Sequence, residues 1–417
     1  MTVLIKHFAH AFAQRFVVLF CVLASIYAPS TFAQEDDELL APEELDLKEE
    51  INSLKRAIDR PELVYKLNLK NQGYKKLPPT FAKLTKLQVL MLDDNPLTEL
   101  PPGLENMKNL QILTITNARL KNIPPSTFAK LINLQTLSLA GTPLGKFPKG
   151  LEQCTKLEIL SLAKTQLKGA APQELAKLPN LLALTLAEND ITSLPDAFCA
   201  MPKLLQLNLS RNKLQTLPQN LDKFLVLNDL EISVNNFSVF PASLATLPKL
   251  RRLILQENPL QSWSPALATM KNLRLLNISS CKIAQFPTEI CSLDSLIIFT
   301  ANNNRFSEIP SAISGMANLR EFNIAYSQVK ALPKEFTALK ELRYVNLSYN
   351  QLQDLPEELA DMTSLITLNV YGNQCKKLPQ NIGNLKKLTE CFVLLGNPLP
   401  KQEVERVTGL FAPNVVQ

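Results

Sequence analysis

The feature that most constrains this chain is a repeat of 23 residues that begins at Val64 and continues almost to the end of the sequence. Two units have 24 residues, and in one unit Trp263-Ser264 replaces the apolar-proline pair that marks the others. We count 15 repeats, and a period of this size predicts a solenoid in which each unit packs only on its neighbours. The marker pairs are Leu77-Pro78, Leu100-Pro101, Ile123-Pro124, Phe147-Pro148, Leu194-Pro195, Leu217-Pro218, Phe240-Pro241, Phe286-Pro287, Ile309-Pro310, Leu332-Pro333, Leu355-Pro356 and Leu378-Pro379.

The residues within one unit predict its local structure. The pattern is L-x-x-L-x-L-x-x-N-x-L-x-x-L-P, as in Leu204, Leu207, Leu209, Asn212, Leu214, Leu217 and Pro218. The L-x-L core is a short strand whose leucines face inward while the intervening residues face solvent on a parallel sheet. Proline ends sheet pairing because it lacks an N–H, and the apolar spacing of three beyond it predicts helical or 3-10 turns. The sequence therefore predicts an α/β solenoid, a horseshoe with a concave parallel β-sheet, short helical or 3-10 segments on the convex side, and helical caps at both ends.

The asparagine of the pattern lies where the chain leaves the strand. A buried amide there can pair backbone groups of its own and neighbouring units, which predicts a structural ladder. Repeats three to five instead carry Ala118, Thr142 and Thr165, and later repeats carry Cys281 and Ser327. We therefore expect a softer segment around residues 110 to 170. The ladder residues are Asn95, Asn189, Asn212, Asn235, Asn258, Asn304, Asn350 and Asn373.

The repeat array, residues 62–400, needs a cap at each end because a solenoid leaves an apolar cross-section open. For the N-terminal cap, residues 46–61, we predict a helix, since Leu47, Ile51, Leu54 and Ile58 share one helical face and Asp46 with Glu49 has capping-box spacing. For the C-terminal cap, residues 401–417, we predict a helix that buries Val404, Val407 and Leu410 and stops at Gly409. The acidic segment 34–45 before the first cap is expected to be flexible.

Residues 1–33 have the pattern of a secretory signal peptide: Lys6 and Arg15, then an apolar run, then Thr31-Phe32-Ala33. An uncleaved anchor is the alternative, although the apolar run is shorter than the roughly 20 residues that a membrane-spanning helix needs. The sequence thus predicts export to the periplasm, the cell surface or the medium. Without Lys6 and Arg15 the charge is 42 − 38 = +4, from 44 basic and 38 acidic residues in the whole chain. No long basic run is present, so we expect no nucleic-acid partner.

The 23-residue unit, which covers residues 62–400, resembles the Ras-group leucine-rich-repeat scaffolds of eukaryotes and their exported bacterial relatives. The resemblance implies a binding scaffold but no particular partner, because function on a shared fold depends on the exposed residues. The signal peptide departs from the eukaryotic members, which are mostly intracellular.

The sequence offers little for catalysis or for holding a cofactor or metal ion. Its two histidines, His7 and His10, both lie in the predicted signal peptide, so the processed chain has no histidine for general-base or metal chemistry. Gly141, Gly145 and Gly150 do not have the spacing of a phosphate-binding loop. A calcium site at Asp93-Asp94-Asn95 is disfavoured because the remaining ligand spacing is missing. We expect a non-enzymatic protein without a cofactor.

Six cysteines remain after residue 33, and the repeat frame assigns most of them to the core. Cys199 and Cys291 share a position four repeats apart, which at about 4.8 Å per strand is beyond disulfide reach. Free buried thiols are the favoured interpretation, although the sequence leaves pairing open. The remaining four are Cys154, Cys281, Cys375 and Cys391.

The outward positions change along the array, and they carry the candidate binding site. Repeats three to six present small uncharged residues, whereas repeats twelve to fourteen gather four of the seven tyrosines beside columns of arginine and asparagine. Tyrosine and arginine on a rigid sheet favour a protein-binding surface, with a solvated surface of no binding role as the alternative. We expect a monomeric module with a protein partner; a structural envelope protein or a glycan or peptidoglycan binder is the other candidate. The candidate residues are Tyr326, Tyr344, Tyr349, Tyr371, Arg320, Arg343, Asn323, Asn346 and Asn369.

Overall fold

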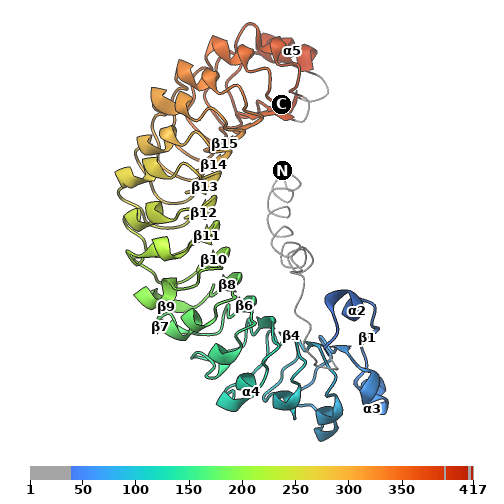
Figure 1. Ribbon diagram of the computed structural model, residues 1–417. Helices are drawn as coiled ribbons and strands as arrows, with labels where there is room; N and C mark the ends of the chain where they lie inside the picture. Colours follow the sequence, from blue (N-terminus) through green and yellow to red (C-terminus); the bar gives the residue numbers. More distant parts are fainter. Residues whose placement is uncertain (1–38, 389–390, 412–414, 417) are drawn as a thin grey trace. The chain divides into compact units, whose positions relative to one another are not determined.

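The computed structural model describes residues 39–388, 391–411 and 415–416, with the side chains of 391–393 and 415–416 excepted. The chain divides into two units, Met1–Ala41 and Pro42–Gln417. The predicted signal peptide and most of the acidic segment lie outside the described residues. The second unit is a stack of repeats with its strands on the inner side and short helical turns on the outer side (Figure 1). The solenoid predicted from the repeat is confirmed.

Every repeat contributes one three-residue strand to a single parallel sheet. The sheet has 17 strands, of which 15 belong to repeats and two to the caps. Neighbours pair in strict register, so that Val345 of one repeat lies between Phe322 and Leu368 of the adjacent repeats. The repeat strands are β2 (Lys66–Asn68), β3 (Val89–Met91), β4 (Ile112–Thr114), β5 (Thr136–Ser138), β6 (Ile159–Ser161), β8 (Ala183–Thr185), β10 (Gln206–Asn208), β11 (Asp229–Glu231), β12 (Arg252–Ile254), β13 (Leu275–Asn277), β14 (Ile298–Thr300), β15 (Glu321–Asn323), β16 (Tyr344–Asn346), β17 (Thr367–Asn369) and β18 (Cys391–Val393).

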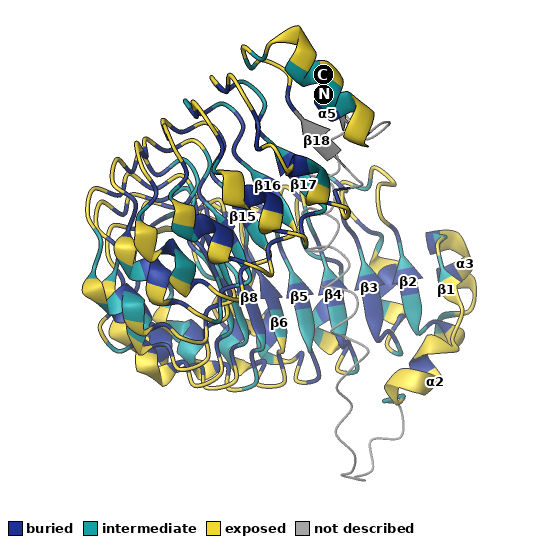
Figure 2. Ribbon diagram, turned by 90° about the horizontal axis from the view of Figure 1, so that it is seen from above, coloured by how far each residue is buried: buried dark blue, intermediate teal, exposed yellow. Residues whose placement is uncertain are grey.

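The outer face consists of 3-10 turns that begin directly after proline in most repeats. This proline is the extended N-cap residue, and because it has no N–H it cannot continue the sheet pairing. Figure 2 shows their outer positions exposed and the strands half-buried. The turns are η3 (Pro79–Lys83), η4 (Leu104–Asn106), η5 (Leu151–Gln153), η6 (Gln173–Lys177), η7 (Asp196–Cys199), η8 (Leu221–Lys223), η9 (Ala242–Thr246), η10 (Pro265–Thr269), η11 (Thr288–Ser292), η12 (Ser311–Gly315), η13 (Lys334–Ala338), η14 (Glu357–Asp361) and η15 (Ile382–Asn384), with the short helix α4 (Pro125–Ala129) in one repeat.

Longer units are accommodated outside the main sheet. The strands β4 and β5, β6 and β8, and β17 and β18 each start 24 residues apart, so there is a third long unit in addition to the two seen in the sequence. In the second of these units the strand β7 (Lys168–Ala170) pairs with β9 (Asp190–Ser193), and the register shifts between Gly169 and Ala170. The register of the main sheet stays intact across this unit, since Ile159 pairs with Ala183 and Leu160 with Leu184.

The asparagine ladder holds the strand exits together. The Asn350 amide, which is typical, donates from Nδ2 to the carbonyls of Ile324 (3.0 Å), Leu347 (3.0 Å) and Ser348 (3.3 Å), and its Oδ1 accepts from the Val329 N–H (3.1 Å). The other asparagines predicted for the ladder make the same kind of bonds, and Asn397 adds a rung that the sequence analysis did not include. Each rung links two repeats, so the ladder pairs backbone groups that would otherwise be buried without partners.

The N-terminal cap differs from the predicted single helix. It consists of α2 (Pro42–Asp46), strand β1 (Glu50–Ile51), α3 (Leu54–Asp59) and η2 (Pro61–Leu63), and the N-cap of α3 is Ser53, not Asp46. Residues at the end of the segment predicted to be flexible thus form α2. The chain is extended at β1 because Glu50 and Ile51 pair with the open edge of β2, whose backbone groups need partners. Leu47 is 87% exposed as a result.

The C-terminal cap is the helix α5 (Lys401–Phe411), followed by strand β19 (Val415–Val416) on the edge of β18. Val407 and Phe411 are buried, whereas Leu410 is 50% exposed, contrary to the prediction, and Gly409 lies inside the helix and not at its end. Phe411 takes the place expected for Leu410 because the helix continues past the glycine. Glu403 accepts from the Leu378 N–H at 2.9 Å and so ties α5 to the last repeat.

Five cysteines are buried and unpaired in the described part of the chain: Cys154, Cys199, Cys281, Cys291 and Cys375. The Cys391 side chain lies outside the described residues. Burial raises the pKa of Cys154, Cys281 and Cys375 to about 12 and that of Cys199 and Cys291 to about 11. These thiols are therefore held as neutral core groups.

Candidate functional site

The candidate residues of repeats twelve to fourteen fall on two different edges of the sheet. Arg320 and Arg343 directly precede β15 and β16 and are exposed at the amino edge of the strands. Tyr326, Tyr349 and Tyr371 follow the strands and lie at the carboxyl edge. The structure thus brings three tyrosines together but separates them from the arginines by the length of the strands.

We call Tyr326, Tyr349 and Tyr371 the tyrosine ladder. The rings of Tyr326 and Tyr349 are stacked with centroids 4.3 Å apart and planes at 17°, and the ring of Tyr349 meets that of Tyr371 edge-on at 4.9 Å and 78°. A side-chain hydrogen bond with Tyr349 and the Coulombic effect of that residue raise the pKa of Tyr371. Since both contacts are favourable geometries for aromatic pairs, the ladder is formed before any partner binds.

The backbone beneath two of the tyrosines is left-handed. Tyr326 has φ 56° and Tyr349 has φ 52°, and this position has positive φ in all the preceding repeats, where it is occupied by residues such as Asn71, Asp94 and Gly141. The left-handed conformation costs an L-residue with a bulky side chain about 1–2 kcal/mol. The backbone conformation at this position disfavours a bulky residue, and the two rings lie outside the core, which points to a role for their side chains.

Glycine and leucine extend the ladder toward the end of the array. Gly372 follows Tyr349 in the same column, and a Cβ there would lie 3.1 Å from Tyr349 Cδ1, so the glycine leaves room for the ring. Leu395 follows Tyr371 in its column and is 44% exposed, and its carbonyl accepts from the Gly372 N–H at 2.9 Å. The sequence analysis missed Leu395. It was recognisable as an apolar residue at an outward position.

The other candidates surround the ladder on the sheet. Tyr344 is half-buried on β16 between Glu321 and Thr367 and is not in the ladder. Asn346 Oδ1 accepts from the Ser348 N–H at 3.1 Å and from its Oγ at 2.8 Å, and Asn369 Oδ1 accepts from the Tyr371 N–H at 3.0 Å. Asn323 Oδ1 accepts from the Ala325 N–H at 3.4 Å in the same way. These asparagines thus fix the strand exits that position the tyrosines.

A charged cluster in the middle of the sheet was not predicted. Arg252 on β12 is 2.5 Å from Asp229 Oδ1 and 3.8 Å from Glu231 Oε2, both on β11, and the three side chains are only 18–19% exposed. Burial raises the pKa of Asp229 and of Glu231, and the nearby Arg252 opposes this rise at both. The sequence could have predicted this cluster, because Asp229 and Arg252 carry opposite charges at the same outward position one repeat apart.

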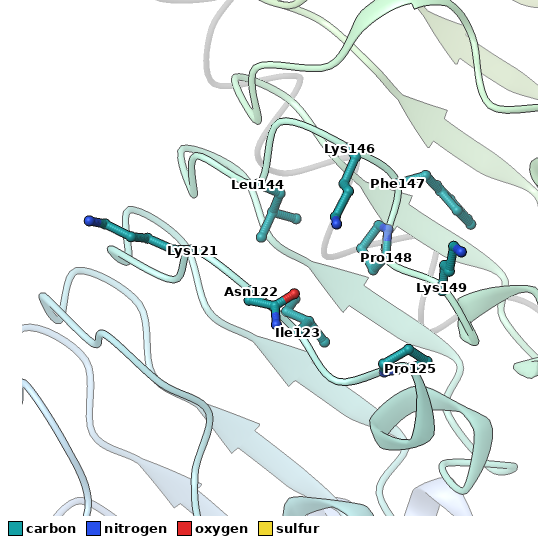
Figure 3. A pocket seen from close by; sticks show the side chains of 9 residues that line it. All are labelled: Lys121, Asn122, Ile123, Pro125, Leu144, Lys146, Phe147, Pro148 and Lys149. Atoms are coloured by element: carbon teal, nitrogen blue, oxygen red, sulfur yellow. The ribbon is translucent and has the colours of Figure 1, made fainter.

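A hollow of about 60 Å³ lies elsewhere, between the turns of repeats three and four. It is lined by Ile123, Leu144, Phe147 and prolines and rimmed by Lys121, Lys146 and Lys149. Figure 3 shows Lys121 extending away from the others, so the three ammonium groups do not converge. Convergent polar groups are what a small-molecule site requires, and this hollow lacks them.

No group of three or more His, Cys, Asp or Glu side chains in the described ranges is arranged to hold a metal ion. At the sequence position considered for calcium, Asp93 forms an ion pair with Lys70 at 3.0 Å and accepts from Thr114 Oγ1 at 2.8 Å. Burial raises the pKa of Asp93, but the hydrogen bonds from Lys70, Thr114 and Thr116 outweigh it and lower the pKa. Its carboxylate is thus committed to contacts between repeats. None of the helices among these residues is long and apolar enough to span a membrane.

Comparison with curated proteins finds no similar sequence. Among solved structures, a leucine-rich-repeat protein of Leptospira interrogans matches with a TM-score of 0.79 at 29% identity, over 89% of this chain and 100% of that one. An internalin of Listeria monocytogenes matches with a TM-score of 0.63 at 21% identity, over 75% and 88%, which is a likeness of fold alone. The plant peptide hormone receptor RGFR1 in complex with RGF2 matches with a TM-score of 0.63 at 25% identity, over 85% of this chain and 58% of that one.

Family profiles agree with this fold. One profile described as leucine rich repeat matches residues 108–167, 155–214 and 317–375, and a second with the same description matches 86–107 and 272–293. Together the profiles cover half of the chain, and the stacked units extend the same register over the rest of the array. The chain belongs to the leucine-rich-repeat proteins.

Proposed function

We propose that this protein is a non-enzymatic binding module whose C-terminal surface recognises a protein partner. The observation that carries the proposal is the tyrosine ladder, a preformed aromatic surface on a rigid sheet surrounded by asparagine, serine and glycine. This composition is typical of antibody paratopes, where tyrosine supplies contact area at low entropic cost and small polar residues supply adaptable hydrogen bonds. The peptide receptor with 25% identity, which was solved in complex with RGF2, supports a polypeptide ligand.

The same proposal includes export. Residues 1–33 have the pattern of a signal peptide, and cleavage after Ala33 would leave Gln34 first. N-terminal sequencing of protein recovered from the envelope and the medium tests this point. Recovery with Met1 intact in the membrane fraction would instead establish an uncleaved anchor.

Capture from envelope and host extracts tests the binding function. The variant carries Tyr326→Ala, Tyr349→Ala and Tyr371→Ala, which removes the tyrosine ladder, and the matched control carries Thr136→Ala and Ser138→Ala on the inner face of the small uncharged region. We expect a partner that the native protein and the control retain and that the tyrosine variant loses while its circular dichroism stays native. Equal capture by all three would place the site elsewhere on the array. No capture by any of them would favour a structural role in the envelope.

A further inference from the structure

Tyr326 ends the tyrosine ladder and presents one face of its ring to solvent. Its other face is stacked on Tyr349 at 4.3 Å, yet the residue is 53% exposed, the largest exposure among the bulky aromatic and aliphatic residues of repeats twelve to fourteen. In the described part of the chain Tyr349 is the one aromatic ring in contact with it, and no cation lies over it. The ring is therefore held in place from one side and open on the other.

The residue that precedes Tyr326 in its column is held away from this open face. Asn303 donates from Nδ2 to Ser280 Oγ at 3.1 Å, which draws its side chain toward the previous repeat. Tyr326 itself is fixed by its N–H, which donates to the Ser348 carbonyl at 2.9 Å, and by its left-handed backbone. A fixed ring loses little conformational entropy when a ligand stacks on it.

Two side-chain amides contact the backbone next to Tyr326. The Ala325 N–H, one residue before Tyr326, donates to Asn302 Oδ1 at 2.9 Å and to Asn323 Oδ1 at 3.4 Å, so both amides lie next to the tyrosine. Gln328, two residues beyond it, is exposed. Arg305, two residues after Asn303, is exposed and would repel a cationic ligand.

We infer that the open face of Tyr326 is a stacking site for a neutral sugar ring of a glycan. A pyranose has one face of C–H groups, which the negative face of an aromatic ring attracts, and a rim of hydroxyls, which side-chain amides can pair. The hydroxyl rim can pair the side-chain amides of Asn302 and Asn323, which a ligand without polar groups would leave without partners. The sugar site uses the end ring of the ladder that carries the proposed protein binding, but the two proposals can fail separately, since a chain that captures no protein can still bind a sugar.

Titration with neutral oligosaccharides tests the inference. The probes are oligomers of hexoses and of N-acetylhexosamines, added to the purified protein and followed by calorimetry and by saturation-transfer NMR. We expect at least one series to bind, with Tyr326→Ala weakening the affinity about tenfold and Tyr326→Phe retaining it, because phenylalanine keeps the ring face. Tyr344→Ala, which lies outside the ladder, is the matched control and should bind like the native protein.

The salt dependence separates stacking from ionic attraction. Binding to a neutral ring should not change between low and physiological salt, since no charge pair is formed. Three results would overturn the inference: no binding by any neutral oligosaccharide, equal binding by native protein and Tyr326→Ala, or binding confined to acidic sugars and abolished by salt. Protein capture measured on the same Tyr326 variants shows whether the two surfaces overlap.

Discussion

Repeats three to five (residues 110–180) and repeats twelve to fourteen (residues 319–387) have the same backbone register but differ at two kinds of position. The first region has three successive ladder rungs without asparagine: Ala118 has no polar side-chain group, and Thr142 Oγ1 makes two bonds, to the Ile115 carbonyl at 3.0 Å and from the Ala118 N–H at 3.3 Å. The second region has one weak rung, Ser327, whose buried Oγ has no partner. That rung is flanked by asparagines on both sides.

The two regions also differ in the residues at their outward positions, which are not the residues that form the asparagine ladder. Thr114, Thr136 and Ser138 give the first region a small uncharged surface, whereas the second carries the tyrosine ladder. The comparison teaches that the residues that stabilise a repeat and the residues that give it a binding surface are separate sets. Each set can therefore be altered without the other.

The largest expected effect is the loss of an intact rung. Asn350→Ala leaves three buried carbonyls and one N–H without their side-chain partner, so we expect the free energy of unfolding to fall by about 3–5 kcal/mol. Thr142→Ala removes two bonds and should cost about 1–2 kcal/mol. Urea unfolding of both variants measures the difference. Equal losses of stability would contradict the view that an asparagine rung stabilises its repeat more than a threonine rung does.

Two matched cysteines test whether the first region opens more easily. Cys154 and Cys375 are both fully buried at leucine positions, and burial raises the pKa of each to about 12, so neither thiol is activated in the folded state. If opening is about 1.4 kcal/mol easier around Cys154, alkylation of the native protein should modify it about tenfold faster than Cys375. Peptide mass spectrometry measures the two rates.

The control for this experiment is the protein in urea, where the two cysteines should react equally. Amide exchange offers a second measurement, and we expect residues 110–170 to exchange faster than repeats nine to eleven. A Cys375 that reacts as fast as Cys154 in the native state would contradict the softer first region.

The smallest expected effect concerns the left-handed position. Lys164 in repeat five has φ 55°, and Lys164→Asn should raise the free energy of unfolding by about 0.5–1 kcal/mol because asparagine tolerates this conformation. Tyr349→Asn gains the same backbone relief but loses contacts with two rings, each worth about 0.5–1.5 kcal/mol, so it should not stabilise. Thermal unfolding of the pair measures both changes. A stabilising Tyr349→Asn would mean that the ladder stacks only weakly in solution.

The repeat made most of the fold predictable, because a strict period fixes which residues face the core and which strands are neighbours. The N-terminal cap was not predictable in the same way. Residues 46–59 do have a helical apolar period, but the open edge of β2 competes for the same backbone, and Glu50 with Ile51 pairs there instead. Local pattern and tertiary hydrogen bonding conflict at this point, and pairing with the sheet edge prevails.

The sequence predicted which residues belong to the candidate site but not how their side chains are arranged. The sequence placed four tyrosines on adjacent repeats, but it could not show that Tyr326 and Tyr349 share a left-handed position while Tyr371 approaches from the next column. It also grouped Arg320 and Arg343 with them, although a three-residue strand separates the two edges. Side-chain contact depends on backbone conformation at the strand exit, which the repeat pattern does not specify.

The left-handed position has a consequence for how such a chain can change. Its N–H always donates to a carbonyl of the following repeat, as for Asp94 to Thr116, Val234 to Gln256 and Tyr349 to Tyr371, so the main chain holds the position whatever side chain it carries. The array is thus a row of outward positions about 4.8 Å apart, at each of which a single substitution changes the exposed side chain without changing the backbone. Duplication or exchange of whole repeats would move such sites along the row without refitting the interior.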